Sequence, residues 1–268
     1  MAVPYKAPVK DIVFGYEVID SYNVLNKISA FSDFSEDIVI PTMEECAKFS
    51  EEVLAPINAI GDQQGATIKD GVVTMPEEFV DAYQKFAEAG WASISLPSDI
   101  GGGGMPITLS GGTLEILSTA NLAFGLAPGL SAGAISAINF HGSQEQKDKF
   151  LPKLVSGEWT GTMNLSEPQS GSDLGTITTK AEPQEDGSYK ITGTKVWITF
   201  GEHNMTENII HLVLAKVPGS PEGTKGISMF IVPKYMVDDD GSVGDSNNVN
   251  CISIEEKLGI HASPTCVM

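Results

Sequence analysis

The spacing of apolar residues changes near Trp159, and this change restricts the possible folds more than any other feature of the sequence. Before it, apolar side chains recur every three to four positions, which is the period of an amphipathic helix. From Trp159 to Ser166, apolar or small residues alternate with Thr, Asn and Ser, as in a strand with two different faces. Helices followed by strands predict an α+β fold with two segregated layers.

Four to six helices are expected before the change. The apolar stripe from Met43 to Ile57 marks one face of a helix that begins near Pro41. Ser143, three residues before Gln146, predicts a capping box at the start of the last helix. These signals together favour a helical bundle.

The stretch Ala120–Phe140 has no charged residue and is long enough to cross a bilayer. Its apolar residues are mostly small, and it contains Pro128. We interpret it as two closely packed helices, one ending near Phe124 and the next beginning near Leu130, in a protein without a membrane span. The N-terminus lacks an apolar signal core, so we expect a cytoplasmic protein.

Six to eight strands are expected after the change. Asp186-Gly187, between apolar runs at 176–181 and 189–192, is a strong signal for a hairpin turn. The last residues, 266–268, resemble the middle of a strand, which would leave an unpaired sheet edge. We therefore expect the sequence to be the front portion of something longer.

Acidic residues outnumber basic ones, since 35 Asp plus Glu against 16 Lys plus Arg give a net charge of −19. A broad nucleic-acid-binding surface needs clustered Lys and Arg, so the sequence argues against a nucleic-acid partner. The three cysteines lie far apart, and the histidines share no ligand spacing. We expect reduced, packed thiols and no metal site.

The densest functional signal is the sequence MNLSEPQSGSDLG at 163–175. A strand delivers Ser166 and breaks at Pro168, and the small residues Ser170, Gly171 and Ser172 follow. Small residues let backbone N–H groups and hydroxyls approach a ligand closely, which suits phosphate or carbonyl oxygens. Taken alone, a Ser/Gly segment after a strand is also typical of a plain turn.

A second signal lies about 30 residues further on, where 195–199 has the sequence KVWIT. It places the large ring of Trp197 close to the hydroxyl of Thr199 on a strand. A single Trp in a sheet is also typical of a core residue. The two signals in this order are more specific than either one.

Together the two segments resemble signature sequences of the acyl-CoA dehydrogenase family. Residues 163–173 are similar to the flavin loop of that family, and residues 193–199 to its second flavin segment. Residues 226–233 and 256–260 are similar to two further signatures. The resemblance extends through the helical part, from about residue 35 to the end.

This resemblance implies a leader at 1–34, a helical N-terminal domain at 35–158 and a β-barrel domain at 159–268, with the helical C-terminal domain of the family absent. FAD is the cofactor that it implies. The residues that would contact FAD are Met163, Leu165, Ser166, Gly171, Ser172, Trp197, Ile198 and Thr199. Ser172 would also approach the acyl-CoA substrate.

Members of the family oxidise an acyl-CoA to the trans-2-enoyl-CoA by removing an α-proton and passing a β-hydride to flavin N5. Their catalytic Glu lies in the C-terminal domain, so the resemblance implies no catalytic base in this chain and no activity of the chain alone. Glu167 and Asp173 are interpreted as residues that shape the loop. An electron-transfer flavoprotein as acceptor, homo-oligomers of the full-length protein and a place in fatty acid metabolism are also implied.

The leader permits two interpretations. Tyr5-Lys6-Ala7-Pro8 and the residues after it resemble the leader of a bacterial subgroup that includes 3-methylmercaptopropionyl-CoA dehydrogenases. The same residues fit an amphipathic extension that packs on another domain.

Two alternatives to a dehydrogenase stay open. A flavin acyl-CoA oxidase shares the chemistry but returns its electrons to oxygen, so oxygen consumption by a full-length protein would identify it. A truncated module without catalysis would show no flavin spectrum after purification.

Overall fold

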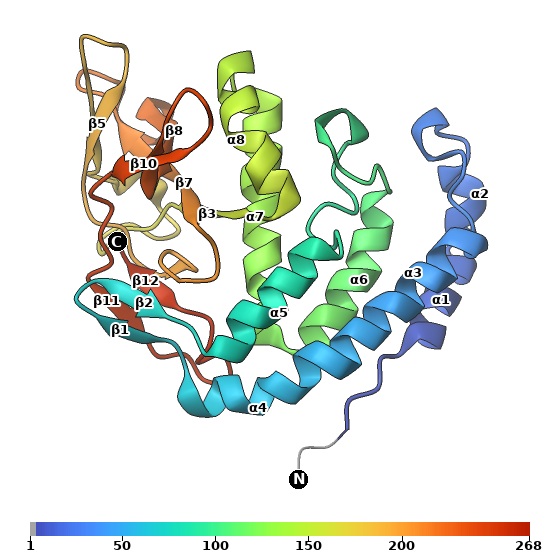
Figure 1. The fold of residues 1–268 in the computed structure, drawn as a ribbon. Helices are drawn as coiled ribbons and strands as arrows, with labels where there is room; N and C mark the ends of the chain where they lie inside the picture. Colours follow the sequence, from blue (N-terminus) through green and yellow to red (C-terminus); the bar gives the residue numbers. More distant parts are fainter. Residues whose placement is uncertain (1–3) are drawn as a thin grey trace.

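The computed structural model describes residues 4–268. Figure 1 shows helices side by side in one part of the molecule and strands in the other, so the predicted α+β class is confirmed. The helices are α1 (Val9–Val18), α2 (Ser21–Leu25), α3 (Glu36–Phe49), α4 (Ala55–Gln64), α5 (Glu77–Glu88), α6 (Ile107–Ala120), α7 (Leu122–His141) and α8 (Gln144–Ser156). Short 3₁₀ turns occur at Ser29–Phe31, Ser98–Ile100, Leu174–Thr176 and Gly223–Gly226.

The strands lie mostly in the second half. They are β1 (Thr67–Lys69), β2 (Val72–Thr74), β3 (Trp159–Asn164), β4 (Lys180–Pro183), β5 (Tyr189–Thr192), β6 (Ile198–Thr199), β7 (Asn208–Lys216), β8 (Ile227–Pro233), β9 (Tyr235–Val237), β10 (Val243–Ser246), β11 (Ser253–Glu255) and β12 (Thr265–Val267). The β1–β2 hairpin, which turns at Asp70-Gly71 with positive φ at both residues, was not predicted. The predicted hairpin at Asp186-Gly187 joins β4 and β5.

The core of the helical half is apolar and aromatic. Phe79, Tyr83 and Phe86 project from one face of α5 and surround Phe124 of α7, with ring centroids 5.6 to 6.4 Å apart. All four rings are buried. The leader joins this half, because α1 packs on α3 and the Tyr16 hydroxyl donates to the Thr108 carbonyl of α6.

The helix with the Met43 stripe begins at Glu36, which corrects the predicted start near Pro41. Ser35 is its N-cap residue, and Glu36 and Asp37 place negative charge at the positive end of the helix dipole. Pro41 therefore lies inside α3. A π-helical turn at Ser50–Leu54 continues α3 into α4.

The apolar stretch forms one helix after position 121, which corrects the predicted break near residues 125–129. The break is at Asn121, whose side chain accepts from the Phe124 N–H as a cap and donates to the Leu54 carbonyl. Pro128 lies inside α7. By length and composition α7 could cross a membrane, with a mean hydropathy of 1.4; here it packs against α6, α8 and β3.

Helix α7 is shared by the two halves (Figure 1). On its strand side, Gly161 of β3 lies so close that a Cβ there would overlap the Cβ of Ala134. The Ser131 hydroxyl accepts from the Gly161 N–H at 3.1 Å. Helix α8 then leads back to β3, and it begins with the predicted capping box of Ser143 and Gln146.

The strands after residue 158 form the predicted β domain, as separate sheets without the continuous pairing of a closed barrel. Strand β7 pairs in parallel with β3 and antiparallel with β8, and it contacts β4, which carries β5. A separate three-stranded sheet has the order β11-β12-β6. Closure needs two neighbours for every strand, and in the described part of the chain β5 and β6 each have only one.

Candidate cofactor-binding site

The loop after β3 is short and held by its own hydrogen bonds. The Glu167 and Ser170 backbones exchange N–H···O bonds of 2.8 and 2.9 Å. The Ser170 hydroxyl donates to the Asp173 carbonyl at 2.7 Å, and the Asp173 side chain accepts from the Gly175 N–H. The backbone between 167 and 175 is therefore ordered locally, as the interpretation of Glu167 and Asp173 as loop-shaping residues requires.

The two predicted segments lie side by side. The Val196 N–H donates to the Ser166 carbonyl at 2.9 Å, which joins the end of the first segment to the second. Strand β6 then pairs on its other side with β12, where Ile198 is opposite Cys266. Two segments about 30 residues apart in sequence thus form one continuous surface.

Trp197 has a strained backbone and an exposed ring. Its φ is +58°, in a region that bulky residues rarely adopt. Its side chain is 55% exposed, although Val196 and Ile198 beside it are buried. Strain of this kind costs about 1–3 kcal/mol and clusters at ligand sites. The fold thus holds an indole ring at the surface beside the Ser166 loop.

Ser166 presents a free backbone donor at this surface. Its carbonyl is taken by Val196, and the carbonyl of Leu165 accepts from the Lys195 ammonium at 3.0 Å. A trans peptide directs its N–H opposite to its C=O, so the Ser166 N–H points away from Lys195. In the described chain this N–H and the Ser166 hydroxyl have no protein acceptor. They can therefore bind a ligand oxygen.

The remaining predicted residues differ in what they expose. Met163 and Thr199 are half-buried, whereas Gly171 and Ser172 are exposed at the loop tip. The Ile198 side chain is buried in a small cluster with Val73, Cys251, Cys266 and Met268. Only the backbone of Ile198 is therefore available to a ligand.

Glu167 and Lys195 form a buried ion pair behind the surface, with 2.9 Å between Oε1 and Nζ. Their residues are 2% and 3% exposed. Burial alone would raise the Glu167 pKa, but hydrogen bonds from Thr179, Thr178 and Lys195 outweigh it and lower the pKa well below its usual range. No role was predicted for Lys195, although a single Lys among apolar strand residues is a usable signal.

A buried polar layer lies on the face of β3 turned away from α7. The Thr160 hydroxyl contacts His203 Nε2 at 2.9 Å, and the Thr162 hydroxyl contacts His211 Nδ1 at 2.7 Å and donates to Asn164. Burial lowers the pKa of both histidines to about 3, so both are neutral at pH 7. This layer was not predicted, because folding brings His203 and His211 to the threonines of β3 from distant parts of the sequence.

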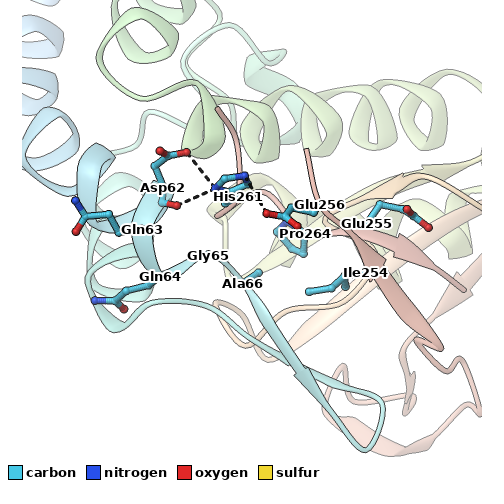
Figure 2. A pocket seen from close by; sticks show the side chains of 10 residues that line it. All are labelled: Asp62, Gln63, Gln64, Gly65, Ala66, Ile254, Glu255, Glu256, His261 and Pro264. Carbon is cyan, nitrogen blue, oxygen red and sulfur yellow. Dashed lines mark hydrogen bonds and ion pairs between the residues drawn. The ribbon is translucent and has the colours of Figure 1, made fainter. Parts of the chain in front are cut away.

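Two cavities lie elsewhere. Figure 2 shows a cavity of about 250 Å³ between the end of α4 and β11, where His261 Nδ1 is 3.2 Å from an Asp62 carboxylate oxygen and Nε2 is 3.6 Å from Glu256. The other, of about 720 Å³, lies between α3 and the 89–103 segment, and Phe49 and Trp91 are among its lining residues. Neither is lined by the residues predicted to contact the cofactor. No cluster of metal-ligating side chains occurs within residues 4–268.

Comparison with protein families gives two matches. The acyl-CoA dehydrogenase N-terminal domain matches residues 41–158, and the acyl-CoA dehydrogenase middle domain matches residues 162–268. The chain belongs to the acyl-CoA dehydrogenase family. The family resemblance seen in the sequence is thereby confirmed. The surface at Ser166 and Trp197 lies within the middle domain of the family.

Individual relatives agree with this membership. The chain is 45% identical to 3-methylmercaptopropionyl-CoA dehydrogenase of Ruegeria pomeroyi over 98% of its own length and 45% of that protein. Among solved structures it resembles an acyl-CoA dehydrogenase complexed with FAD from Bacillus anthracis, with a TM-score of 0.68, 26% identity and 88% of this chain and 35% of that chain covered. A structure titled for an electron transferring flavoprotein of Acidaminococcus fermentans has a TM-score of 0.65 at 26% identity, covering 88% and 55%. The chain spans 43–45% of the length of four curated relatives that it matches, the Ruegeria pomeroyi protein included.

Proposed function

We propose that the chain is the FAD-contacting front portion of an acyl-CoA dehydrogenase. The observation that carries the proposal is the junction of Ser166 and Val196, which places a free backbone donor beside an exposed, strained Trp197. Family membership and a solved relative that holds FAD support the same cofactor.

The residue types fit a flavin. The indole of Trp197 offers an apolar wall for a fused ring, and the Ser166 N–H and hydroxyl offer donors to its oxygen or nitrogen edge. A Cβ added at Gly171 would meet no atom within 4 Å, so a phosphate can approach its backbone, and Ser172 adds a hydroxyl there. FAD, when bound, supplies an acceptor for a hydride.

The reaction class that we propose is oxidation of an acyl-CoA to a trans-2-enoyl-CoA. The relative from Ruegeria pomeroyi supports 3-methylmercaptopropionyl-CoA as the substrate. Donors at Ser166 and Thr199 would stabilise charge on the reduced cofactor. A water-excluding wall at Trp197 would protect the reactive face.

No base for the proton step is proposed in this chain. Glu167 follows Ser166 directly in the sequence, but its oxygens are occupied and its pKa is lowered, so it is a poor proton acceptor. We propose that this chain alone is inactive. The likeness to an electron transferring flavoprotein structure supports such a flavoprotein as acceptor for the complete enzyme, which we expect to be a homo-oligomer.

Substitution of Trp197 tests the cofactor site. Trp197→Ala is expected to raise the FAD dissociation constant about tenfold, because one aromatic contact is lost, while the unfolding midpoint stays within error of the unsubstituted chain. Flavin absorbance and fluorescence titration measure the first quantity, and urea denaturation the second. Trp91→Ala, at a half-buried Trp in the other half, is the matched control. Equal FAD affinity in Trp197→Ala and the unsubstituted chain would contradict the placement.

A further inference from the structure

A buried ion pair lies directly behind the surface proposed to bind FAD. Glu167 belongs to the loop after β3, and Lys195 to the segment just before Trp197. A buried pair contributes little net stability compared with apolar residues of the same size, so its presence calls for another role.

The Glu167 carboxylate is fully occupied. Oε1 accepts from the Thr179 N–H, the Thr179 hydroxyl and the Lys195 ammonium at 2.6 to 3.1 Å. Oε2 accepts from the Thr178 N–H, the Thr178 hydroxyl and the Gln169 amide at 2.7 to 2.9 Å. With so many donors, the carboxylate is fixed in place before any ligand arrives.

Lys195 connects three segments. Its ammonium donates to the Leu165 carbonyl at 3.0 Å as well as to Glu167. Its backbone exchanges hydrogen bonds of 2.8 and 2.7 Å with Met268, the residue that follows β12. The Lys195 side chain therefore links the Leu165 carbonyl to a residue three positions before β6 whose own backbone is fixed by Met268.

We propose that Lys195, held by Glu167, is a positioning residue that orders the Leu165–Ser166 peptide so that the Ser166 N–H faces the cofactor. This inference rests on the proposed function. Without the ammonium, the part-buried Leu165 carbonyl has no protein donor, and the peptide gains freedom to rotate. The pair thus acts through Ser166 and does not itself touch the flavin.

A second ion pair provides a matched control. Lys234 Nζ and Glu202 Oε1 are 2.6 Å apart, and their side chains are 17% and 5% exposed. Neither side chain bonds to residues 163–173. Lys234→Met removes a partly buried ammonium from the same half of the molecule and leaves the Leu165 carbonyl bonded.

Two measurements on the intact 268-residue chain test the proposal. In Lys195→Met, amide hydrogen exchange across 163–173 is expected to be at least about tenfold faster than in the unsubstituted chain, and the FAD dissociation constant at least about tenfold higher. Exchange in β7 is expected to stay unchanged. Lys234→Met is expected to leave both the exchange at 163–173 and the FAD affinity as they are.

The double variant Glu167→Gln/Lys195→Met separates positioning from stability. It removes both charges, so the denaturation midpoint is expected to recover toward that of the unsubstituted chain. The Leu165 carbonyl still lacks its donor, so exchange stays fast and FAD binding stays weak. If Lys195→Met does not fold, the double variant decides the question on its own.

Unchanged exchange at 163–173 in Lys195→Met and in the double variant overturns the proposal. A double variant that regains full FAD affinity overturns it too. Absence of FAD binding by the unsubstituted chain contradicts the proposed function instead. In that case the exchange measurement, which needs no cofactor, still decides whether Lys195 orders the loop.

Discussion

The two halves of the molecule bury different kinds of side chain. Around Phe124 the helical half buries aromatic and aliphatic groups, and its buried polar residues are a few Ser, Thr and Asn. The strand half buries Glu167, Lys195 and Glu202 together with two histidines. Within residues 4–268, every buried charged side chain lies after position 158. The buried groups of the helical half therefore mainly stabilise the fold. Those of the strand half hold polar groups at fixed positions next to the surface at Ser166 and Trp197.

This difference follows from what each half must supply. Apolar burial is non-directional and stabilises a scaffold in proportion to its area. Buried polar groups stabilise less, but each fixes a direction, because their hydrogen bonds must be satisfied. The strained Trp197 and the bound carbonyl of Leu165 are directional features of this kind.

The largest expected effect concerns the apolar core. Phe124→Ala removes a ring that contacts Phe79, Tyr83 and Phe86, and it is expected to lower the free energy of unfolding by about 3–5 kcal/mol. Urea denaturation measures the change. Phe140→Ala, at a ring 79% exposed on the same helix, is the control and is expected to have little effect. A loss below about 1 kcal/mol for Phe124→Ala would mean that the core around α5 does not carry the helical half.

The next effect concerns the neutral histidines of the strand half. The unfolded chain binds protons at histidine below about pH 6.5, whereas burial lowers the folded pKa of His203 and His211 to about 3. The contribution of the two histidines to the free energy of unfolding is therefore present above pH 6.5 and is lost as the pH falls toward 3. From about pH 7 to 5, the free energy of unfolding should fall by about 2 kcal/mol for each histidine.

His211→Asn tests this pH dependence. The amide can keep the contact of Nδ1 with Thr162 but does not titrate. The loss of stability between about pH 7 and 5 should therefore be smaller by about 2 kcal/mol than in the unsubstituted chain. Denaturation curves at both pH values measure it. Parallel losses in the two proteins would show that His211 is not the group that titrates.

The last effect concerns the contact between the halves. Gly161→Ala adds a methyl group that meets Ala134 and is expected to cost about 1–3 kcal/mol. Gly133→Ala, on α7 with no atom within 4 Å of the added carbon, should instead stabilise the helix by about 0.5–1 kcal/mol. Thermal denaturation of both variants gives the comparison, and a neutral Gly161→Ala would show that α7 can shift away from β3.

The helical half was largely predictable because its signals are local. The Met43 stripe and the Ser143 capping box depend on residues within a turn or two. The two helix boundaries that were predicted wrongly, one near Pro41 and one near Pro128, were both placed at a proline. Pro41 and Pro128 both lie inside helices: α3 begins after the extended residue Ser35, and α7 begins at the side-chain cap of Asn121.

The strand half was predictable in its motifs and less so in its pairing. The sequence indicated that the Ser166 and Trp197 segments belong together, and they do meet. It could not show that Lys195 reaches Leu165, since that contact depends on how β6 aligns with the loop. The order of the strands within the sheets was not predictable either, because pairing between distant strands is not encoded in local alternation.

Helix α7 couples the packing of the two halves. One side of it completes the aromatic cluster and the other lies against β3, so neither half can lose its packing without disturbing the other. Heating should therefore produce one cooperative transition, observed at the same temperature by a probe in either half.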